Sequence, residues 1–116
     1  MGLQALALAG APALLEQASQ IMMKRGIAKG ITYDNGLIDA TGALCLAGGA
    51  KMKTLNEDPI AELSTIKRPL ILVIIEALEA ELDSDLHTWN DLPTTTASMV
   101  ATTFKSLADK ISIASI

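Results

Sequence analysis

The sequence predicts an all-α fold, a compact bundle of four or five helices with one short β-hairpin near Asn35-Gly36. Half of the 116 residues are hydrophobic, yet the chain has only one Trp, one Tyr and one Phe. The core must therefore be built from aliphatic side chains, among which Ala and Leu strongly favour helices. Apolar residues also recur every three to four positions, which is the helical period. The length suits a single domain over residues 1–116.

The first segment of the chain, residues 1–11, is small and apolar, and we expect a first helix or a loose arm there. No basic residue precedes Lys24, although a signal peptide would begin with one. Pro12 can occupy the first turn of the next helix. The buried face of that helix consists of Leu14, Leu15, Ala18, Ile21 and Met22. It should end at Gly26, after Lys24 and Arg25.

The pair Asn35-Gly36 predicts a tight hairpin turn, because both turn positions need a positive φ. Two very short strands, or one irregular turn, would flank the pair and pack on the helices. The segment from Gly42 to Ala50 then predicts a short buried helix that is closed by Gly48 and Gly49.

Two helices are expected in the middle of the chain. Asp58 followed by Pro59 predicts the cap and first turn of a short helix that reaches about Ile66. The apolar segment that starts at Pro69 predicts a long central helix to Leu82 rather than a buried strand, because it is too long for a strand. The expected buried face of this helix is Ile71, Ile75, Leu78 and Leu82.

The last part of the chain predicts a polar turn and a final helix. Residues 83–93 are rich in polar side chains and are expected to form the turn. Thr96 predicts the N-terminal cap of the final helix. The buried stripe of that helix is Val100, Phe104, Leu107, Ala108 and Ile111.

Three pieces of the sequence occur together in a recognisable order. They are Lys24-Arg25-Gly26 at a helix end, the stretch from Tyr33 and Gly36 through Gly42-Ala43-Leu44-Cys45-Leu46 to Gly48-Gly49-Ala50, and Trp89-Asn90-Asp91 followed by Thr96 and Val100. This order resembles a family of small proteins of unknown function from bacteria and their phages, with the motifs Cys-x-x-Gly-Ala and Trp-Asn-Asp…Thr…Val. The likeness covers about Pro12 to Lys110, and two glycines stand where the pattern has one. It implies a helical fold and a phage setting, and no known activity.

The composition excludes several kinds of partner. The net charge of -4 repels phosphate backbones, so we expect no nucleic acid. The longest apolar run, Pro69 to Ile75, is too short to span a bilayer, so we expect no membrane partner. Cys45 is the single cysteine, which rules out an internal disulfide and suits the cytoplasm.

The sequence offers no convincing catalytic residue, metal site or cofactor site. Cys45 and His87 are the one candidate thiol–base pair, but apolar neighbours favour a buried and inert thiol. The acidic residues near His87, which are Asp83, Asp85 and Asp91, lack the central Gly and closing Glu of a calcium loop. We therefore expect neither an enzyme nor a cofactor.

A glycine-rich segment, Gly48-Gly49-Ala50-Lys51, lacks the Gly-Lys-Ser/Thr of a phosphate loop. The segment more simply ends a helix where chains pack tightly, and a weaker ligand-binding turn stays open as an alternative.

The segment Trp89-Asn90-Asp91 has two interpretations. In the structural one, the Asn and Asp side chains bond nearby backbone groups and set a turn, while Trp89 covers the core. In the functional one, the segment clamps a ligand or partner through indole stacking and polar hydrogen bonds.

These observations lead to three function hypotheses. The first is a non-enzymatic protein–protein interaction module, a homo-oligomer and a phage accessory factor that blocks a host defence protein, because apolar chain ends usually meet a partner. The second is a small-ligand or nucleotide binder with a pocket between Trp89, Tyr33 and Gly48-Gly49. An enzyme comes third, because no nucleophile, base and orienting group can be assembled.

Overall fold

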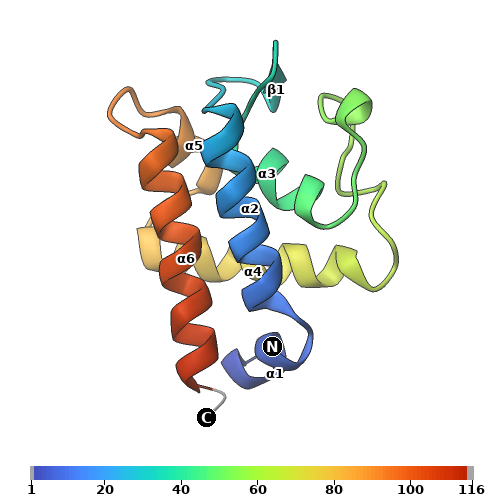
Figure 1. Ribbon diagram of the computed structural model, residues 1–116, viewed down its shortest axis with the longest axis vertical. Helices are drawn as coiled ribbons and strands as arrows, with labels where there is room; N and C mark the ends of the chain where they lie inside the picture. The colour runs from blue at the N-terminus through green and yellow to red at the C-terminus, as the bar shows by residue number, and fades with distance from the viewer. Residues whose placement is uncertain (1, 115–116) are drawn as a thin grey trace.

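The computed structural model describes residues 2–114 and contains six α-helices and one two-stranded hairpin within them (Figure 1). The predicted all-helical class with one hairpin is confirmed, with six helices instead of four or five. The elements are α1 Leu3–Leu8, α2 Ala11–Arg25, β1 Tyr33–Asp34, β2 Leu37–Ile38, α3 Ala40–Ala47, the short 3₁₀ helix η1 Met52–Thr54, α4 Lys67–Leu82, α5 Leu86–Asp91 and α6 Ala97–Ala114.

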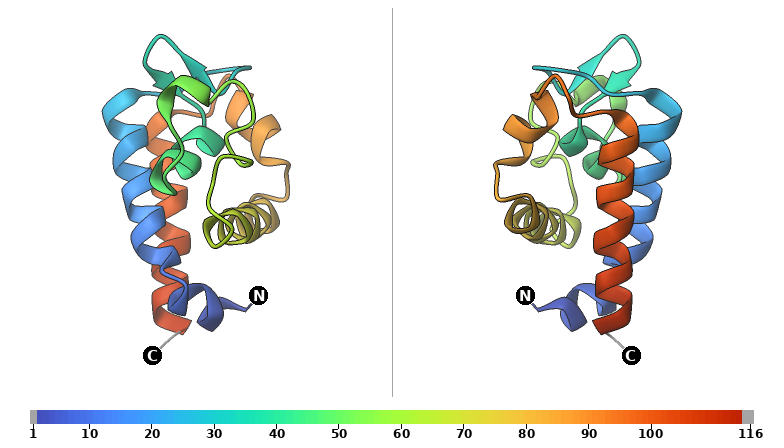
Figure 2. Two further views of the ribbon diagram at one scale, coloured as in Figure 1. Left: turned by 90° about the vertical axis from the view of Figure 1, so that its right-hand side faces the viewer. Right: turned by 90° about the vertical axis from the view of Figure 1, so that its left-hand side faces the viewer.

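Helices α2 and α6 lie side by side and antiparallel, and α4 crosses behind them (Figures 1 and 2). Their apolar stripes meet in one core, in which Phe104 is fully buried. The other large side chains at its centre are Leu15, Met22, Leu44, Ile71, Ile74, Leu78 and Leu107. The predicted stripes of α2 and α6 thus form the core, except that Ile21 is only half-buried.

The start of the chain forms a helix rather than a loose arm. Helix α1 buries Leu6 against the core, while Met1 lies outside the described residues. Gly10 takes a left-handed φ of 84° between α1 and α2, and Pro12 sits in the first turn of α2 as predicted. Helix α2 ends at Gly26, whose N–H donates to the carbonyl of Met22.

The predicted turn and the short buried helix are also confirmed. Asn35 and Gly36 both have positive φ and close an antiparallel pair in which Tyr33 faces Ile38. Helix α3 starts at Ala40, two residues before the predicted start. Its N-terminal cap is Asp39, whose Oδ1 accepts a hydrogen bond from the N–H of Gly42 at 2.7 Å.

The predicted helix from Asp58 to Ile66 is wrong. Asp58 does accept a bond from the N–H of Ala61, but at 3.2 Å it closes a single turn that does not continue. Ser64 then helps to begin α4, because its Oγ accepts a hydrogen bond from the N–H of Lys67, the first residue of that helix. Of the residues in this segment only Leu63 is buried, so a helical face would gain little, and local side-chain bonds decide its path.

Two further expectations need correction. The segment 83–93 is not only a turn, because it contains α5, whose cap is Asp85 accepting from the N–H of Thr88 at 3.0 Å. In α4 the buried face includes Leu70 and Ile74 with Ile71 and Leu78, whereas Ile75 and Leu82 are half-buried. Within residues 2–114, no helix is both long and apolar enough to cross a membrane.

Candidate functional site

The side chain of Asn90 joins three segments of the fold. It lies on α5 and is only 1% exposed. Its Nδ2 donates to the carbonyl of Ala28 at 2.9 Å and to Oδ1 of Asp91 at 3.0 Å, while its Oδ1 accepts from the N–H of Ala40 at 2.9 Å. Asn90 therefore holds α5 against the loop after α2 and against the first residue of α3.

Asp91 and Lys29 add further hydrogen bonds to this contact. Oδ1 of Asp91 accepts from the N–H of Gly30 at 2.9 Å. This bond, with the one from Asn90, holds the pKa of Asp91 below its ordinary value. The Nζ of Lys29 lies 2.5 Å from the carbonyl oxygen of Asn90. It also lies 2.7 Å from two more carbonyl oxygens, those of Leu92 and Thr95, so one ammonium satisfies three acceptors where α5 ends.

Trp89 packs on the core and is half-buried. Its carbonyl accepts a hydrogen bond from Oγ1 of the buried Thr95 at 2.7 Å. All three residues of the Trp89-Asn90-Asp91 segment thus contact other parts of the chain, and only Asn90 is fully buried. The clamp interpretation stays a prediction.

The other residues of the predicted ligand pocket serve the local backbone. The N–H and the carbonyl of Tyr33 bond the side-chain amide of Asn56, both at 2.8 Å. Gly48 caps α3, and Gly49 turns the chain with a φ of 108°. The two cavities described below are lined by other residues, so the pocket between Trp89, Tyr33 and Gly48-Gly49 also stays a prediction.

Cys45 is fully buried on α3, and burial raises the pKa of its thiol to about 12, with smaller effects from the carboxylates of Asp39 and Asp58. The His87 side chain is 60% exposed, and its Nδ1 lies 3.6 Å from Oδ2 of the buried Asp39. A thiol that holds its proton so tightly is a poor nucleophile. Across residues 2–114, His, Cys, Asp and Glu side chains form no group of three that could hold a metal ion.

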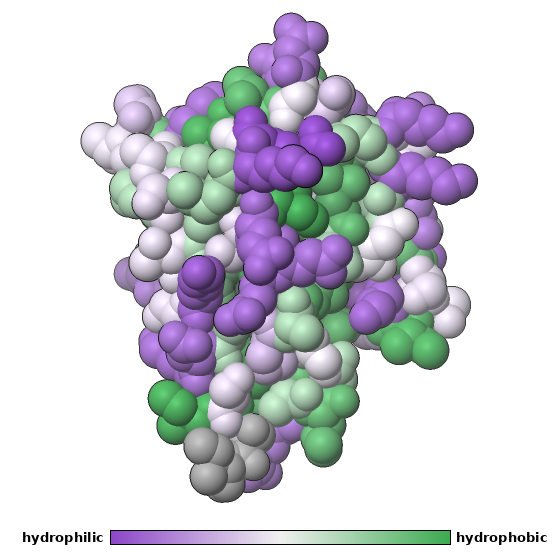
Figure 3. All heavy atoms as spheres, viewed as in Figure 1, coloured by the Kyte–Doolittle hydropathy of each residue, from purple (hydrophilic) through white to green (hydrophobic). Residues whose placement is uncertain are grey.

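One end of the molecule is apolar and has no charged side chain over two stretches of chain, residues 2–15 and 111–114. Its exposed apolar side chains are Leu3, Leu8 and Ile113, and we call this surface the apolar end. Nε2 of Gln4 donates to the carbonyl of Ala114 at 3.4 Å, which places α1 beside the last turn of α6. In Figure 3 apolar residues lie at this lower end of the molecule together with polar ones.

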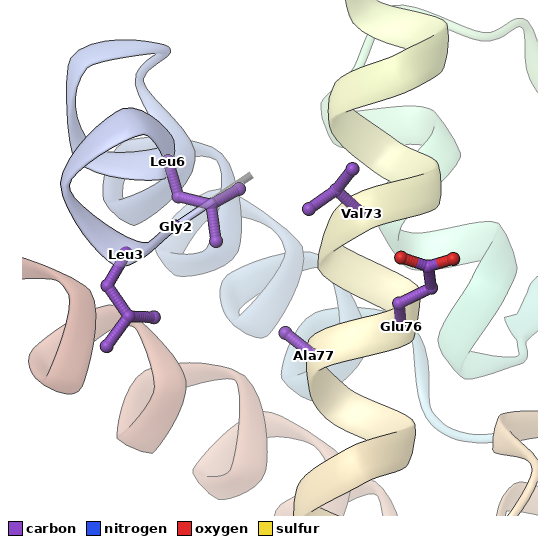
Figure 4. Close-up of a pocket in the computed structure, with 6 residues that line it drawn as sticks. All are labelled: Gly2, Leu3, Leu6, Val73, Glu76 and Ala77. Atoms are coloured by element: carbon purple, nitrogen blue, oxygen red, sulfur yellow. The ribbon is translucent and has the colours of Figure 1, made fainter.

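A cavity of about 330 Å³ opens at the apolar end between α1 and α4 (Figure 4). Its lining is Gly2, Leu3, Leu6, Val73, Glu76 and Ala77. Leu6 of α1 faces Val73 of α4 across the opening, and Glu76 supplies the one charged side chain of the lining (Figure 4). The lining thus combines aliphatic side chains with polar atoms, which include the carboxylate of Glu76.

A second and smaller cavity, of about 200 Å³, lies between α2 and α6. It is lined mainly by polar and small side chains, which are Ser19, Met23, Ser98, Ala101, Thr102 and Lys105. Its single cationic residue, Lys105, is exposed.

The fold and the site together define a small all-helical domain, in which Asn90 joins three segments of the chain and three exposed apolar side chains lie at one end. Residues 8–110 match the model of a family of unknown function (DUF6197), and the chain belongs to this family. No curated protein and no solved structure matches it. Residues 3–7 of α1 and the last turn of α6, which build much of the apolar end, lie outside the family match.

Proposed function

We propose that this protein is a non-enzymatic protein-binding module that binds an uncharged, apolar protein surface through its apolar end. The observation that carries the proposal is the clustering of exposed aliphatic side chains there, with Leu8 91% exposed and Ile113 69% exposed. Single exposed leucines are ordinary on protein surfaces. A group of them beside a cavity is typical of a surface that a partner covers.

The position of these residues supports one continuous surface. Leu8 follows Gln4 by one helical turn, so both lie on the same face of α1. Gln4 bonds the carbonyl of Ala114, next to Ile113. Leu3 lies beside Gln4 in the chain and also lines the cavity. The three exposed aliphatic residues therefore surround a single contact between α1 and α6.

The resemblance to small proteins of bacteria and their phages supports the setting that we propose. In that setting the protein is a cytoplasmic phage accessory factor whose binding activity blocks a host defence protein. The hydrogen bonds of the Trp89-Asn90-Asp91 segment and the burial of Cys45 support structural roles for them, so we propose that such a factor acts through the apolar end.

A photoreactive amino acid placed at position 8 tests the proposal in living cells. We expect a discrete protein adduct after irradiation, and we expect untagged wild-type protein to compete it away. The control is the same photoreactive group at Ile31, which is 45% exposed and lies next to the hairpin. Equal labelling from both positions, or labelling that wild-type protein does not compete, would contradict the proposal.

A further inference from the structure

We propose that the cavity between α2 and α6 is a binding site for a phosphate group, either free phosphate or the phosphate of a small monoester. This site is separate from the apolar end and does not depend on the function proposed above. The two helices lie side by side (Figure 1), and the cavity between them has a volume of about 200 Å³. Its lining contains three hydroxyl groups and one ammonium group, those of Ser19, Ser98, Thr102 and Lys105.

The hydroxyl of Ser19 is the observation that points to a ligand. The residue is only 2% exposed, and its Oγ makes no hydrogen bond within residues 2–114. No side-chain oxygen or nitrogen in that range is both sealed from solvent and unbonded, so the Ser19 oxygen must open onto the cavity that the residue lines. A buried hydroxyl without a partner has lost the hydrogen bonds that water gives it. An acceptor bound in the cavity would satisfy it.

Helix α6 places three more donors on the same cavity. Ser98, Thr102 and Lys105 occupy positions i, i+4 and i+7, which lie on one face of a helix. Their hydroxyl and ammonium groups form no hydrogen bond or ion pair within residues 2–114. The neighbouring Thr103 differs, because its Oγ1 donates to the carbonyl of Met99 at 2.8 Å. The donors that line the cavity are therefore available to a ligand.

The chemistry of these four donors favours an oxyanion with several oxygens. The Lys105 ammonium can only donate hydrogen bonds, and it is the one charged group in the lining. A hydroxyl hydrogen can rotate toward an acceptor, so Ser19 and the two hydroxyls of α6 can donate as well. A phosphate group offers at least three strong acceptor oxygens, whereas a carboxylate offers two. A phosphate group therefore matches the number of donors better than a carboxylate does.

Size and charge also fit this ligand. A water molecule takes about 30 Å³ in the liquid, so a cavity of about 200 Å³ has room for a small oxyanion. Glu16 precedes Ser19 and Asp109 follows Lys105 by one helical turn each, and neither acid lines the cavity. The α1–α4 cavity differs, because the carboxylate of Glu76 in its lining repels an anion. Of the two cavities, the one between α2 and α6 thus suits a phosphate group.

Isothermal titration calorimetry of the full chain with inorganic phosphate tests the proposal, with chloride added to hold the ionic strength constant. We expect saturable binding at millimolar or lower concentrations of phosphate. Ser19→Ala and Lys105→Met should each weaken it by at least about tenfold, because each removes a hydrogen bond to a charged group. The matched controls are Ser106→Ala, at an exposed serine on α6, and Lys53→Met, at an exposed lysine on η1. Neither residue lines the cavity, so both controls should keep the wild-type affinity.

Thermal unfolding separates a ligand contact from a purely structural role of Ser19. Without phosphate, Ser19→Ala should unfold at the wild-type temperature or above it, because its hydroxyl has no partner to lose. Phosphate should raise the unfolding temperature of the wild type and of Ser106→Ala, and much less that of Ser19→Ala. A Ser19→Ala protein that is less stable without phosphate, yet binds phosphate with the wild-type affinity, would overturn the site.

Nuclear magnetic resonance of the isotope-labelled chain shows where the phosphate binds. The amide signals of Ser19, Ser98 and Thr102 should shift as phosphate saturates, while those of the hairpin stay in place. Phenyl phosphate distinguishes the two sources of the group: tighter binding than inorganic phosphate assigns the site to a monoester, and weaker binding assigns it to the free ion. Shifts centred elsewhere, no saturable binding, or acetate that binds as tightly as phosphate would each overturn the proposal.

Discussion

The side chains of Lys29 and Asn90 each donate a hydrogen bond to a backbone carbonyl at, or next to, the other residue. The Nζ of Lys29 lies 2.5 Å from the carbonyl oxygen of Asn90, and the Asn90 amide donates to the carbonyl of Ala28, one residue before Lys29. The two residues are 61 positions apart in the chain. Their contact closes the loop between α2 and the hairpin onto the end of α5.

Asn90→Ala should lower the free energy of unfolding by about 2–4 kcal/mol, because it leaves the N–H of Ala40 and the carbonyl of Ala28 buried without their partner. Urea unfolding followed by circular dichroism measures the loss. Asn56→Ala is the matched control, since Asn56 also bonds backbone groups but is exposed. Its cost should stay below about 1 kcal/mol because water can replace the amide. Similar losses in both variants would contradict the role given to Asn90.

Lys29→Met keeps much of the aliphatic chain and removes the ammonium that three carbonyls accept from. We expect a loss of about 1–2 kcal/mol in the free energy of unfolding, since charged donors near a helix end form comparatively strong bonds. Amide hydrogen exchange should also accelerate in α5 and around Thr95, which bonds within the same turn. Lys53→Met, at an exposed lysine on η1, should change neither measurement. Unaltered exchange in α5 would show that Lys29 does not hold the turn.

Local sequence patterns predicted those parts of the fold in which a residue determines the conformation of residues next to it in the chain. Asn35-Gly36 needs positive φ at two adjacent positions, and Thr96 caps the helix that follows it, as shown by its Oγ1 accepting from the N–H of Met99 at 3.2 Å. The periodic stripes of α2 and α6 extend over several turns, so their faces could be predicted from spacing alone.

The sequence could not reveal the contacts that span long distances along the chain. Lys29 lies in a loop, has no periodic neighbours, and finds its acceptors 61 to 66 residues away. Helix α5 is six residues long, too short to show two turns of apolar spacing. The apolar start of the sequence indicated an apolar surface. The cavity could not be predicted, because it is formed by α1 and α4, which are far apart in the chain.

The stability of the protein should depend on pH through Asp39. Burial raises the pKa of this carboxyl above its ordinary value of 3.8, and the bond from Gly42 and the nearby His87 oppose this only in part. The folded state therefore holds the proton more tightly than the unfolded chain. The resulting stabilisation is complete below the ordinary pKa and is lost as the pH rises through the raised pKa.

Asp39→Asn isolates this effect, because its amide oxygen can still cap α3 while the charge is absent. The variant should gain stability relative to wild type as the pH rises from about 4, and the gain should level off above the raised pKa. Urea unfolding of both proteins between pH 4 and pH 7.5 measures the difference. A constant difference over that range, or one that changes in the opposite direction, would show that burial does not dominate at Asp39.

Cys45 should react with thiol reagents only when the protein opens. Its side chain is fully buried, and burial raises the pKa of the thiol to about 12, so both access and thiolate formation are suppressed. At pH 8, modification by a disulfide reagent should be at least about 1,000-fold slower in the native protein than in urea, since it must follow unfolding. Leu8→Cys supplies the matched control, because its new thiol is exposed on the same fold and should react at once while Cys45 stays protected. Rapid modification of native wild-type protein, at a rate close to that of the Leu8→Cys thiol, would mean that α3 opens far more readily than its packing implies.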